Sequence, residues 1–237
     1  MPCYKNRTLA VIIGRSNVKR NSRCIDEIIW EISNHVEAIM FYRNPYTEIK
    51  SSITPKINAF SKAILTDHYF RPFWRAYLKI KIFRRILQFA YLSLNLKMSI
   101  LLISYVLTRS NDYKNVRKIL KEQEYGRVIL ISHSAGGILS TKLESFEKIV
   151  GCICFGYPFK HPQKEHEPYR TKQLSKVEKP FYIFQGDNDE YGSASKAKEY
   201  SISSSTRIIS VDTDHDFSNL KAVDRKKILD ISLSLVE

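Results

Sequence analysis

Short apolar runs alternate with amphipathic stretches along this chain. Six runs rich in β-branched or aromatic residues are typical of buried parallel strands: Thr8–Ile13, Val36–Tyr42, Arg127–Ser132, Ile149–Phe155, Pro180–Gln185 and Thr206–Val211. Helical patterns lie between most of them, over Asp26–Ser33, Asp112–Glu124, Ala135–Glu147, Ser193–Tyr200 and Ser218–Leu235. Repeated strand–helix units predict an α/β fold of about six mostly parallel strands, with helices on both faces of the sheet.

One region departs from this alternation. No strand pattern occurs from Thr54 to Ser110, a stretch several times longer than one crossover helix needs. It opens aromatic and basic and then turns apolar. We therefore expect a helical insertion over residues 54–110, forming a lid or cap, within a single domain that spans residues 1–237.

The net charge is concentrated in this insertion. The 237 residues include 38 Lys+Arg and 24 Asp+Glu, a formal charge of +14, yet no acidic residue occurs between His68 and Asn111. Three interpretations remain open for residues 68–111: a lid, an element that binds an anionic membrane surface, and a nucleic-acid binder. Because no recognised nucleic-acid-binding motif is present, nucleic acid is not the expected partner.

Composition narrows the class of protein. Hydrophobic residues make up 43% of the chain, which excludes a disordered protein, and the four cysteines form neither a disulfide framework nor a CxxC pair. The opening MPCYKNRTLAVIIG has too short an apolar run for a signal peptide. We expect a reduced, cytoplasmic protein, with peripheral membrane attachment through the insertion as the alternative.

The strongest chemical signal is SHSAGG, which directly follows the strand RVILIS and precedes a helix. This is the context of a nucleophile elbow, a sharp strand-to-helix turn that projects its central serine, Ser134, from the carboxyl edge of the sheet. Small neighbours are needed because the chain passes itself closely there. The alternative is that Ser134 only caps the helix through its side chain.

A serine nucleophile needs a base and an acid that orients the base, and both candidates follow later strands. His215 comes after the last strand and before the last helix. Asp189 follows the strand PFYIFQ and is preferred as the acid, because it lies beyond the strand end, in the turn. Four other aspartates remain alternatives for the acid: Asp187, Asp212, Asp214 and Asp216.

The stretches ILISHSAGG, FGYPFKHPQ, LSKVEKPFYIFQGDNDEYGS and VDTDHDFS resemble the α/β hydrolase superfamily. More narrowly, they are similar to dienelactone-hydrolase-like proteins grouped with testis-expressed protein 30 and KAT8 regulatory complex subunit 3. The resemblance implies an α/β-hydrolase fold and a serine hydrolase that acts on a small ester, thioester or related acyl substrate. It also implies Ser134 as nucleophile, Asp189 as acid and His215 as base.

The same resemblance implies that the oxyanion loop is Gly14-Arg15-Ser16, with the backbone N–H groups of Arg15 and Ala135 as donors. No cofactor is implied. His161 and His166 in HPQKEHEP lack a fixed metal-ligand spacing, so we expect a solvated loop and no metal. The competing function is a catalytically silent hydrolase-like scaffold that binds a membrane or a protein partner through the basic insertion.

Overall fold

The computed structural model describes residues 7–14, 23–42, 112–164 and 167–236. The chain divides into two units, residues 1–43 with 112–237 and residues 44–111, and the description below concerns the first. The expected insertion over residues 54–110 and its basic segment 68–111 lie outside the described residues. The lid and the single-domain organisation therefore stay predictions.

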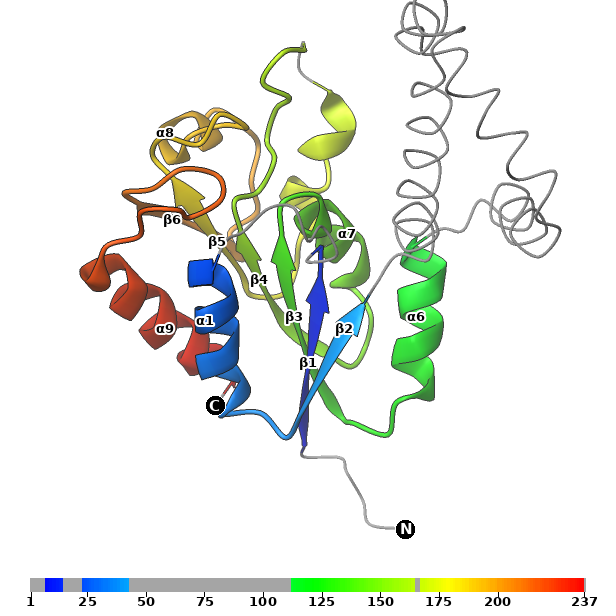
Figure 1. Cartoon of the computed structure of the whole chain (residues 1–237). Coiled ribbons are helices and arrows are strands. Elements are labelled where there is room, and N and C mark those ends of the chain that lie inside the picture. The colour runs from blue at the N-terminus through cyan, green and yellow to red at the C-terminus, as the bar shows by residue number, and fades with distance from the viewer. Residues whose placement is uncertain (1–6, 15–22, 43–111, 165–166, 237) are drawn as a thin grey trace, which may run out of the picture. The chain divides into compact units, whose positions relative to one another are not determined.

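A sheet of six strands forms the centre of the fold (Figure 1). The strands are β1 (Thr8–Ile13), β2 (Ala38–Tyr42), β3 (Arg127–His133), β4 (Ile149–Phe155), β5 (Phe181–Gly186) and β6 (Thr206–Val211). Their order is β2-β1-β3-β4-β5-β6, and every neighbouring pair is parallel. The predicted α/β architecture is confirmed.

Helices cover both faces of the sheet. The helices are α1 (Arg23–Ser33), α6 (Asp112–Glu122), α7 (Ala135–Leu143), α8 (Ala194–Ala197) and α9 (Ala222–Val236), with 3₁₀ turns at Pro168–Arg170 and Leu174–Lys176. Buried residues of α1 and α9 pack in one core cluster, and those of α6, α7 and α8 pack in another. Figure 1 shows α1 and α9 together on one side of the sheet and α7 on the other.

The side-chain alternation of each strand explains why there are two cores. In β1, Leu9 and Val11 belong to the cluster with α6 and α7, whereas Ala10 and Ile12 belong to the cluster with α1 and α9. Successive side chains of a strand point to opposite faces, so a strand that is buried on both faces needs an unbroken apolar run. All six residues of β1 are buried.

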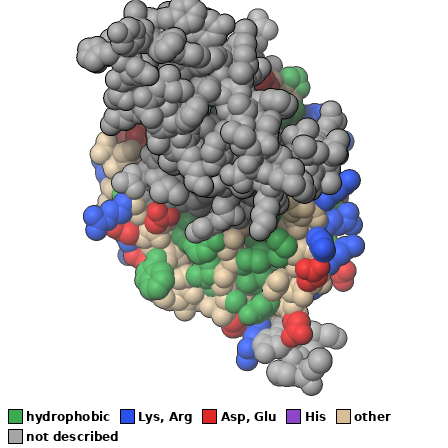
Figure 2. Space-filling model, turned by 45° about the vertical axis from the view of Figure 1, so that its right-hand side comes forward, with side chains coloured by type: hydrophobic (Ala, Val, Ile, Leu, Met, Phe, Trp, Pro, Cys, Tyr) green, Lys and Arg blue, Asp and Glu red, His purple; other side chains and the backbone are tan. Residues whose placement is uncertain are grey.

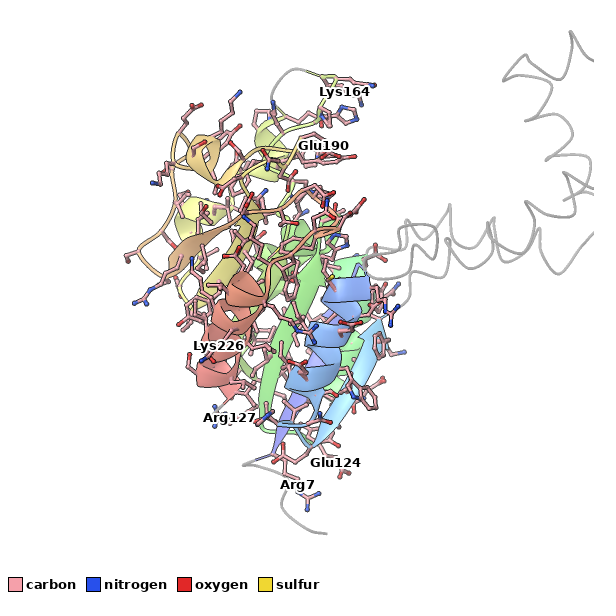
Figure 3. All side chains as sticks on the ribbon, turned by 60° about the vertical axis from the view of Figure 1, so that its left-hand side comes forward. Arg7, Glu124, Arg127, Lys164, Glu190 and Lys226 are labelled. Atoms are coloured by element: carbon pink, nitrogen blue, oxygen red, sulfur yellow. The ribbon has the colours of Figure 1, made fainter. Side chains whose placement is uncertain are left out.

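The strand order places the functional edge. From β1 the chain moves to β2 on one side and then to β3 on the other side of β1, so the direction of winding reverses between β1 and β3. Ligands of open α/β sheets bind beyond the carboxyl ends of the strands at such a switch point. In Figure 3, Arg127 marks the amino end of β3, and Glu190, beyond β5, lies at the opposite end of the molecule.

All five described helices differ from the ranges that the sequence pattern predicts. Helix α1 begins at Arg23 and α6 ends at Glu122, and α8 covers only Ala194–Ala197 of the predicted Ser193–Tyr200. The structure ends α7 at Leu143, four residues before the predicted Glu147. The next residue, Glu144, is buried, and its carboxylate accepts the backbone N–H groups of Glu178 and Lys179. Helix α9 begins at Ala222 rather than at the predicted Ser218. The Ser218 N–H donates instead to the Asp214 carboxylate, at 2.9 Å, and keeps this segment in a turn.

The edge strand β2 is less buried than the central strands. Phe41 is 57% exposed, and Ile39 and Met40 are half-buried. Figure 2 brings this side of the molecule forward and shows apolar side chains near the centre of the visible face, with charged side chains at its margins. Among the described helices, none is both long and apolar enough to span a bilayer.

Candidate active site

Ser134 occupies a strained turn between β3 and α7. Its backbone has φ 52° and ψ −125°, a region that residues with a side chain rarely adopt. The Ser134 N–H donates to the Phe155 carbonyl at 3.0 Å, which ties the turn to the end of β4. Ser134 occupies the N-cap position of α7, as the alternative predicts, but its side chain makes no capping hydrogen bond to the helix.

Glycines let the end of β1 approach this turn. A Cβ atom added to Gly14, whose φ is +86°, would lie 2.4 Å from the His133 carbonyl oxygen. One added to Gly136 would lie 2.7 Å from the Ile13 carbonyl oxygen. No side chain fits at either distance, so the two glycines allow the backbone contact that sets the elbow against β1.

The structure brings the three predicted side chains together at the carboxyl edge of the sheet. His215 Nε2 lies 2.9 Å from Ser134 Oγ, and His215 Nδ1 lies 2.8 Å from Asp189 Oδ2. The imidazole is 1% exposed and Asp189 is 5% exposed, whereas Ser134 is half-buried. This arrangement can deprotonate the hydroxyl through the imidazole while the carboxylate fixes the ring.

Three of the four alternative acids make contacts elsewhere. The carboxylate of Asp187 accepts the Ser210 hydroxyl at 2.6 and 2.7 Å and so links the turn to β6. Asp212 pairs with Lys221, and Asp214 accepts the Ser218 N–H. The contact between Asp189 and His215 therefore favours Asp189 as the acid on geometry.

Burial determines the electrostatics of this acid. Removal from water raises the pKa of Asp189 above its ordinary value, and the hydrogen bond to His215 opposes that rise. The Tyr191 N–H also donates to Asp189 Oδ1 at 2.7 Å. The carboxylate is thus desolvated but supplied with donors on both oxygens, as a buried charge needs.

Sequence reasoning did not find the residues that surround His215. The centre of the Tyr191 ring lies 4.3 Å from the centre of the His215 ring, and that of the His133 ring lies 5.5 Å from it. Gly156, at φ +58°, leaves room for the imidazole, because an added Cβ would lie 3.1 Å from His215 Nδ1. The sequence could have indicated both residues by their position, because Tyr191 lies two residues after Asp189 and His133 lies directly before Ser134.

Sequence reasoning also missed Gln185, which contacts the acid directly. Its Nε2 donates to Asp189 Oδ2 at 2.7 Å and to the Gly192 carbonyl at 2.6 Å, and its Oε1 accepts the Tyr157 N–H at 2.8 Å. The side chain is 0% exposed. The available signal was a single polar residue near the end of the apolar strand FYIFQG, four positions before Asp189.

The predicted oxyanion donors are described only in part. Ala135 is exposed and is the first residue of α7, where backbone N–H groups have no acceptor within the helix. Arg15 and Ser16 lie outside the described residues. The pairing of Arg15 and Ala135 N–H groups as an oxyanion hole therefore stays a prediction.

Cys154, which is buried in β4, is not an activated nucleophile. Burial raises the pKa of the Cys154 thiol to about 12, so this group does not ionise at neutral pH. Within the described residues, no three His, Cys, Asp or Glu side chains gather as a metal site. His161 lies in the described loop, whereas Glu165 and His166 lie outside the described residues.

The match to a family model agrees with this geometry. Residues 108–233, more than half of the chain, match the model of the alpha/beta hydrolase domain. The chain therefore belongs to the α/β hydrolase family and is an enzyme of the hydrolase class. The broad resemblance predicted from ILISHSAGG and VDTDHDFS is confirmed, whereas the narrower group is not identified by this match.

Solved structures with a TM-score of at least 0.50 show the same fold at low sequence identity. The esterase domain of a Rhodothermus marinus protein is 10% identical, with a TM-score of 0.51 over 100% of this chain and 87% of that chain. A "predicted CIB-like hydrolase" from Thermoplasma acidophilum is 13% identical, with a TM-score of 0.50 over 98% and 86%. A Pyrococcus furiosus esterase is 11% identical, with a TM-score of 0.42 over 54% of this chain and 62% of that chain, less than two thirds of its length. No curated protein matches the sequence.

Proposed function

We propose that this protein is a serine hydrolase that cleaves an ester, thioester or related acyl bond through an acyl-enzyme. One observation carries the proposal: His215 joins Ser134 Oγ at 2.9 Å to Asp189 Oδ2 at 2.8 Å, and Ser134 sits in a strained elbow. The residue order serine, acid, histidine along the chain agrees with this fold family.

In the first half-reaction, Ser134 Oγ attacks the acyl carbonyl carbon while His215 Nε2 takes the hydroxyl proton. Asp189 holds the proton on Nδ1 and stabilises the imidazolium that forms. The bond to the leaving alcohol or thiol then breaks, and His215 returns the proton to that leaving group. In the second half-reaction, water attacks the acyl-enzyme with His215 again as base, and the carboxylic acid and free Ser134 are regenerated.

The tetrahedral intermediate of each half-reaction carries a negative oxygen. We assign its stabilisation to the backbone N–H groups of Ala135 and Arg15, at a contribution of roughly 3 kcal/mol per donor. The exposure of Ala135 at the start of α7 supports this assignment, because a carbonyl oxygen of the substrate can reach that N–H.

Hydrolysis of p-nitrophenyl acetate and butyrate tests the proposal. Ser134→Ala is expected to lower kcat/KM by at least about 1,000-fold, since it removes the nucleophile. Ser175→Ala, which changes an exposed serine outside the site, is the matched control and is expected to retain full activity. Equal turnover by the wild type and Ser134→Ala would overturn the assignment.

A fluorophosphonate probe gives an independent measurement, because it forms a covalent bond with an activated serine. Labelling that is lost in Ser134→Ala and retained in Ser175→Ala supports the enzyme. A folded wild-type protein that neither labels nor turns over either ester favours the silent scaffold instead. The narrower similarity of residues 127–217 to dienelactone-hydrolase-like proteins is part of this proposal and leaves the acyl group unassigned.

The basic segment 68–111 motivates a second, separate proposal about location. We propose a cytoplasmic enzyme that associates peripherally with anionic membrane surfaces, because this segment carries eight Lys or Arg and no acidic residue. Flotation with liposomes that contain anionic lipids, compared with neutral liposomes, tests it. If equal amounts of protein float with anionic and neutral liposomes, the proposed attachment to anionic membranes is contradicted. The hydrolase proposal is not affected by that result.

A further inference from the structure

The amide of Gln185 connects three parts of the candidate site. It contacts the Asp189 carboxylate, the Gly192 carbonyl in the turn that carries the acid, and the Tyr157 N–H in the loop that follows β4. All three contacts are 2.6–2.8 Å long and buried. Because Gln185 precedes the last residue of β5, the sheet itself fixes where this side chain begins.

The partners of Gln185 determine the orientation of its amide. Two acceptors, Asp189 Oδ2 and the Gly192 oxygen, face one side, and one donor, the Tyr157 N–H, faces the other. Only an NH₂ group toward the acceptors and an oxygen toward the donor satisfies all three. A glutamate of the same shape satisfies Tyr157 but brings a carboxylate oxygen against two acceptors, at a buried site where such a contact is costly.

Asp189 Oδ2 is shared between Gln185 and His215. The oxygen accepts from Gln185 Nε2 at 2.7 Å and lies 2.8 Å from His215 Nδ1. A carboxylate held from two directions cannot rotate away from the imidazole without losing a hydrogen bond. The Gln185 donor also favours the ionised carboxylate, the form that stabilises an imidazolium.

We infer that Gln185 is a positioning residue for catalysis: its amide holds Asp189 in the orientation and charge state that direct His215 toward Ser134. Gln185 is not assigned a contact with substrate, and it acts through Asp189. The inference rests on the proposed serine hydrolase and extends it to a residue outside the three-residue set.

The test compares two substitutions of similar length in the full chain. Gln185→Met removes every hydrogen bond of the amide, and Gln185→Glu keeps the acceptor for Tyr157 but replaces the donor to Asp189. For hydrolysis of p-nitrophenyl butyrate, we expect kcat to fall by about 10- to 100-fold in Gln185→Met, with KM changed less than about twofold. Gln185→Glu is expected to have the lower kcat of the two at neutral pH.

The order of these two variants separates positioning from a structural role. If Gln185 served only to satisfy the Tyr157 N–H, Gln185→Glu would match the wild type and exceed Gln185→Met. If it served only to fill space, both variants would match the wild type. Either result, in folded variants, overturns the inference. If Gln185→Met does not fold, Gln185→Asn replaces it, because its shorter amide cannot reach Asp189 and Gly192 together and kcat is again expected to fall.

Glu144 provides the matched control. It is 4% exposed, and its carboxylate accepts two backbone N–H groups at the far end of α7, away from the site. Glu144→Met is expected to lower the urea midpoint while leaving kcat unchanged. A kcat loss as large as that of Gln185→Met would show that general destabilisation explains both and would overturn the inference.

A further measurement keeps the inference distinct from the proposed function. In an Asp189→Asn background, adding Gln185→Met is expected to cause no additional loss of fluorophosphonate labelling, because the effect passes through Asp189. If Gln185→Met lowers labelling in that background as much as it does in the wild type, the inference is contradicted, and the serine-hydrolase proposal still stands. A wild-type protein without Ser134 labelling would instead refute the proposed function itself.

Discussion

Two carboxylates, Asp189 at the functional edge and Glu27 on α1, show how differently one fold uses negative charge. The Asp189 side chain is 0% exposed, and burial raises its pKa. The Glu27 side chain is 39% exposed, and a hydrogen bond from Arg225 on α9 lowers its pKa. Arg225 also pairs with Glu31 of α1, so these exposed ion pairs join α1 to α9.

The signs of the two pKa shifts give opposite dependences of stability on pH. A raised pKa means that the folded state holds more protons than the unfolded chain. Protonation of Asp189 therefore favours folding at low pH, and this contribution to the unfolding free energy is lost as pH rises. A lowered pKa means that the folded state holds fewer protons than the unfolded chain. Ionised Glu27 therefore stabilises the fold at neutral pH, and this contribution is lost as pH falls. The candidate site therefore costs stability at neutral pH, and the α1–α9 surface contributes to it.

The largest effect is expected where the site meets β1. Gly136→Ala places a methyl group 2.7 Å from the Ile13 carbonyl oxygen, and neither backbone can move freely, so we expect a loss of roughly 3 kcal/mol in unfolding free energy. The control is Gly151→Ala, whose methyl group would lie nearest to side-chain atoms of Leu235, which can move more easily than backbone. Urea unfolding of both variants checks this, and equal losses would contradict the rigid approach.

A smaller gain is expected from releasing strain at the elbow. Ser134→Gly and Ser134→Ala both remove the hydroxyl, but only glycine adopts φ 52° without a steric penalty. We expect Ser134→Gly to be more stable than Ser134→Ala by about 1 kcal/mol, measured by urea unfolding. The corresponding pair Lys118→Gly and Lys118→Ala, at an exposed position in the middle of α6, is expected to give the opposite order, because glycine destabilises a helix interior. The same order at both positions would contradict the strained turn.

The pH dependence of Asp189 is expected to be measurable. Wild-type stability should fall as pH rises above about 4, the ordinary pKa of aspartate, and Asp189→Asn should lack this component. Urea unfolding at pH 4.5, 6.0 and 7.5 checks the difference in slope. Repeating the comparison in a His215→Gln background removes the imidazole from the balance. Parallel curves in both backgrounds would contradict a burial-raised pKa.

The smallest effect is expected on the α1–α9 surface. Arg225→Gln should lower the urea midpoint slightly at neutral pH, and the loss should shrink in 1 M NaCl because exposed ion pairs are screened. It should also shrink as the pH falls below the ordinary pKa of glutamate, since Glu27 is then protonated. Lys118→Gln, which affects only a 3.9 Å pair within α6, is the control. A salt-independent loss would contradict an electrostatic origin.

The sequence pattern predicted the strands better than the helix ends. The expected ranges Thr8–Ile13, Ile149–Phe155 and Thr206–Val211 match β1, β4 and β6. Apolar runs identify β1 and β4 because a strand that is buried on both faces needs an apolar side chain at nearly every position. The edge strand β6 is only partly buried and is identified by its β-branched residues. Helix α7 was predicted to reach Glu147 but ends at Leu143, where the next residue, Glu144, contacts backbone N–H groups 34 and 35 positions away. Local patterns carry no information about such a contact.

The same distinction applies to the site. Ser134, Asp189 and His215 were predicted because each follows a strand of a parallel sheet, and the sheet brings such positions to one edge. The role inferred for Gln185 was not predictable, since it depends on an acceptor at Gly192 and a donor at Tyr157 that converge only in the folded chain. Residue type and spacing locate the candidate reacting groups, and tertiary contacts locate the residues that hold those groups in place.

Strand β6 lies at the edge of the described sheet and pairs only with β5 there, with Gly186 opposite Val211 at the carboxyl end. His215 follows four residues later. A slip of one residue along β5 would move the start of its loop by about 3.3 Å, more than the 2.9 Å that separates His215 from Ser134. The contact between His215 and Ser134 therefore depends on the register of β6 against β5. Reactivity of Ser134 would show whether β6 has paired with β5 in the native register.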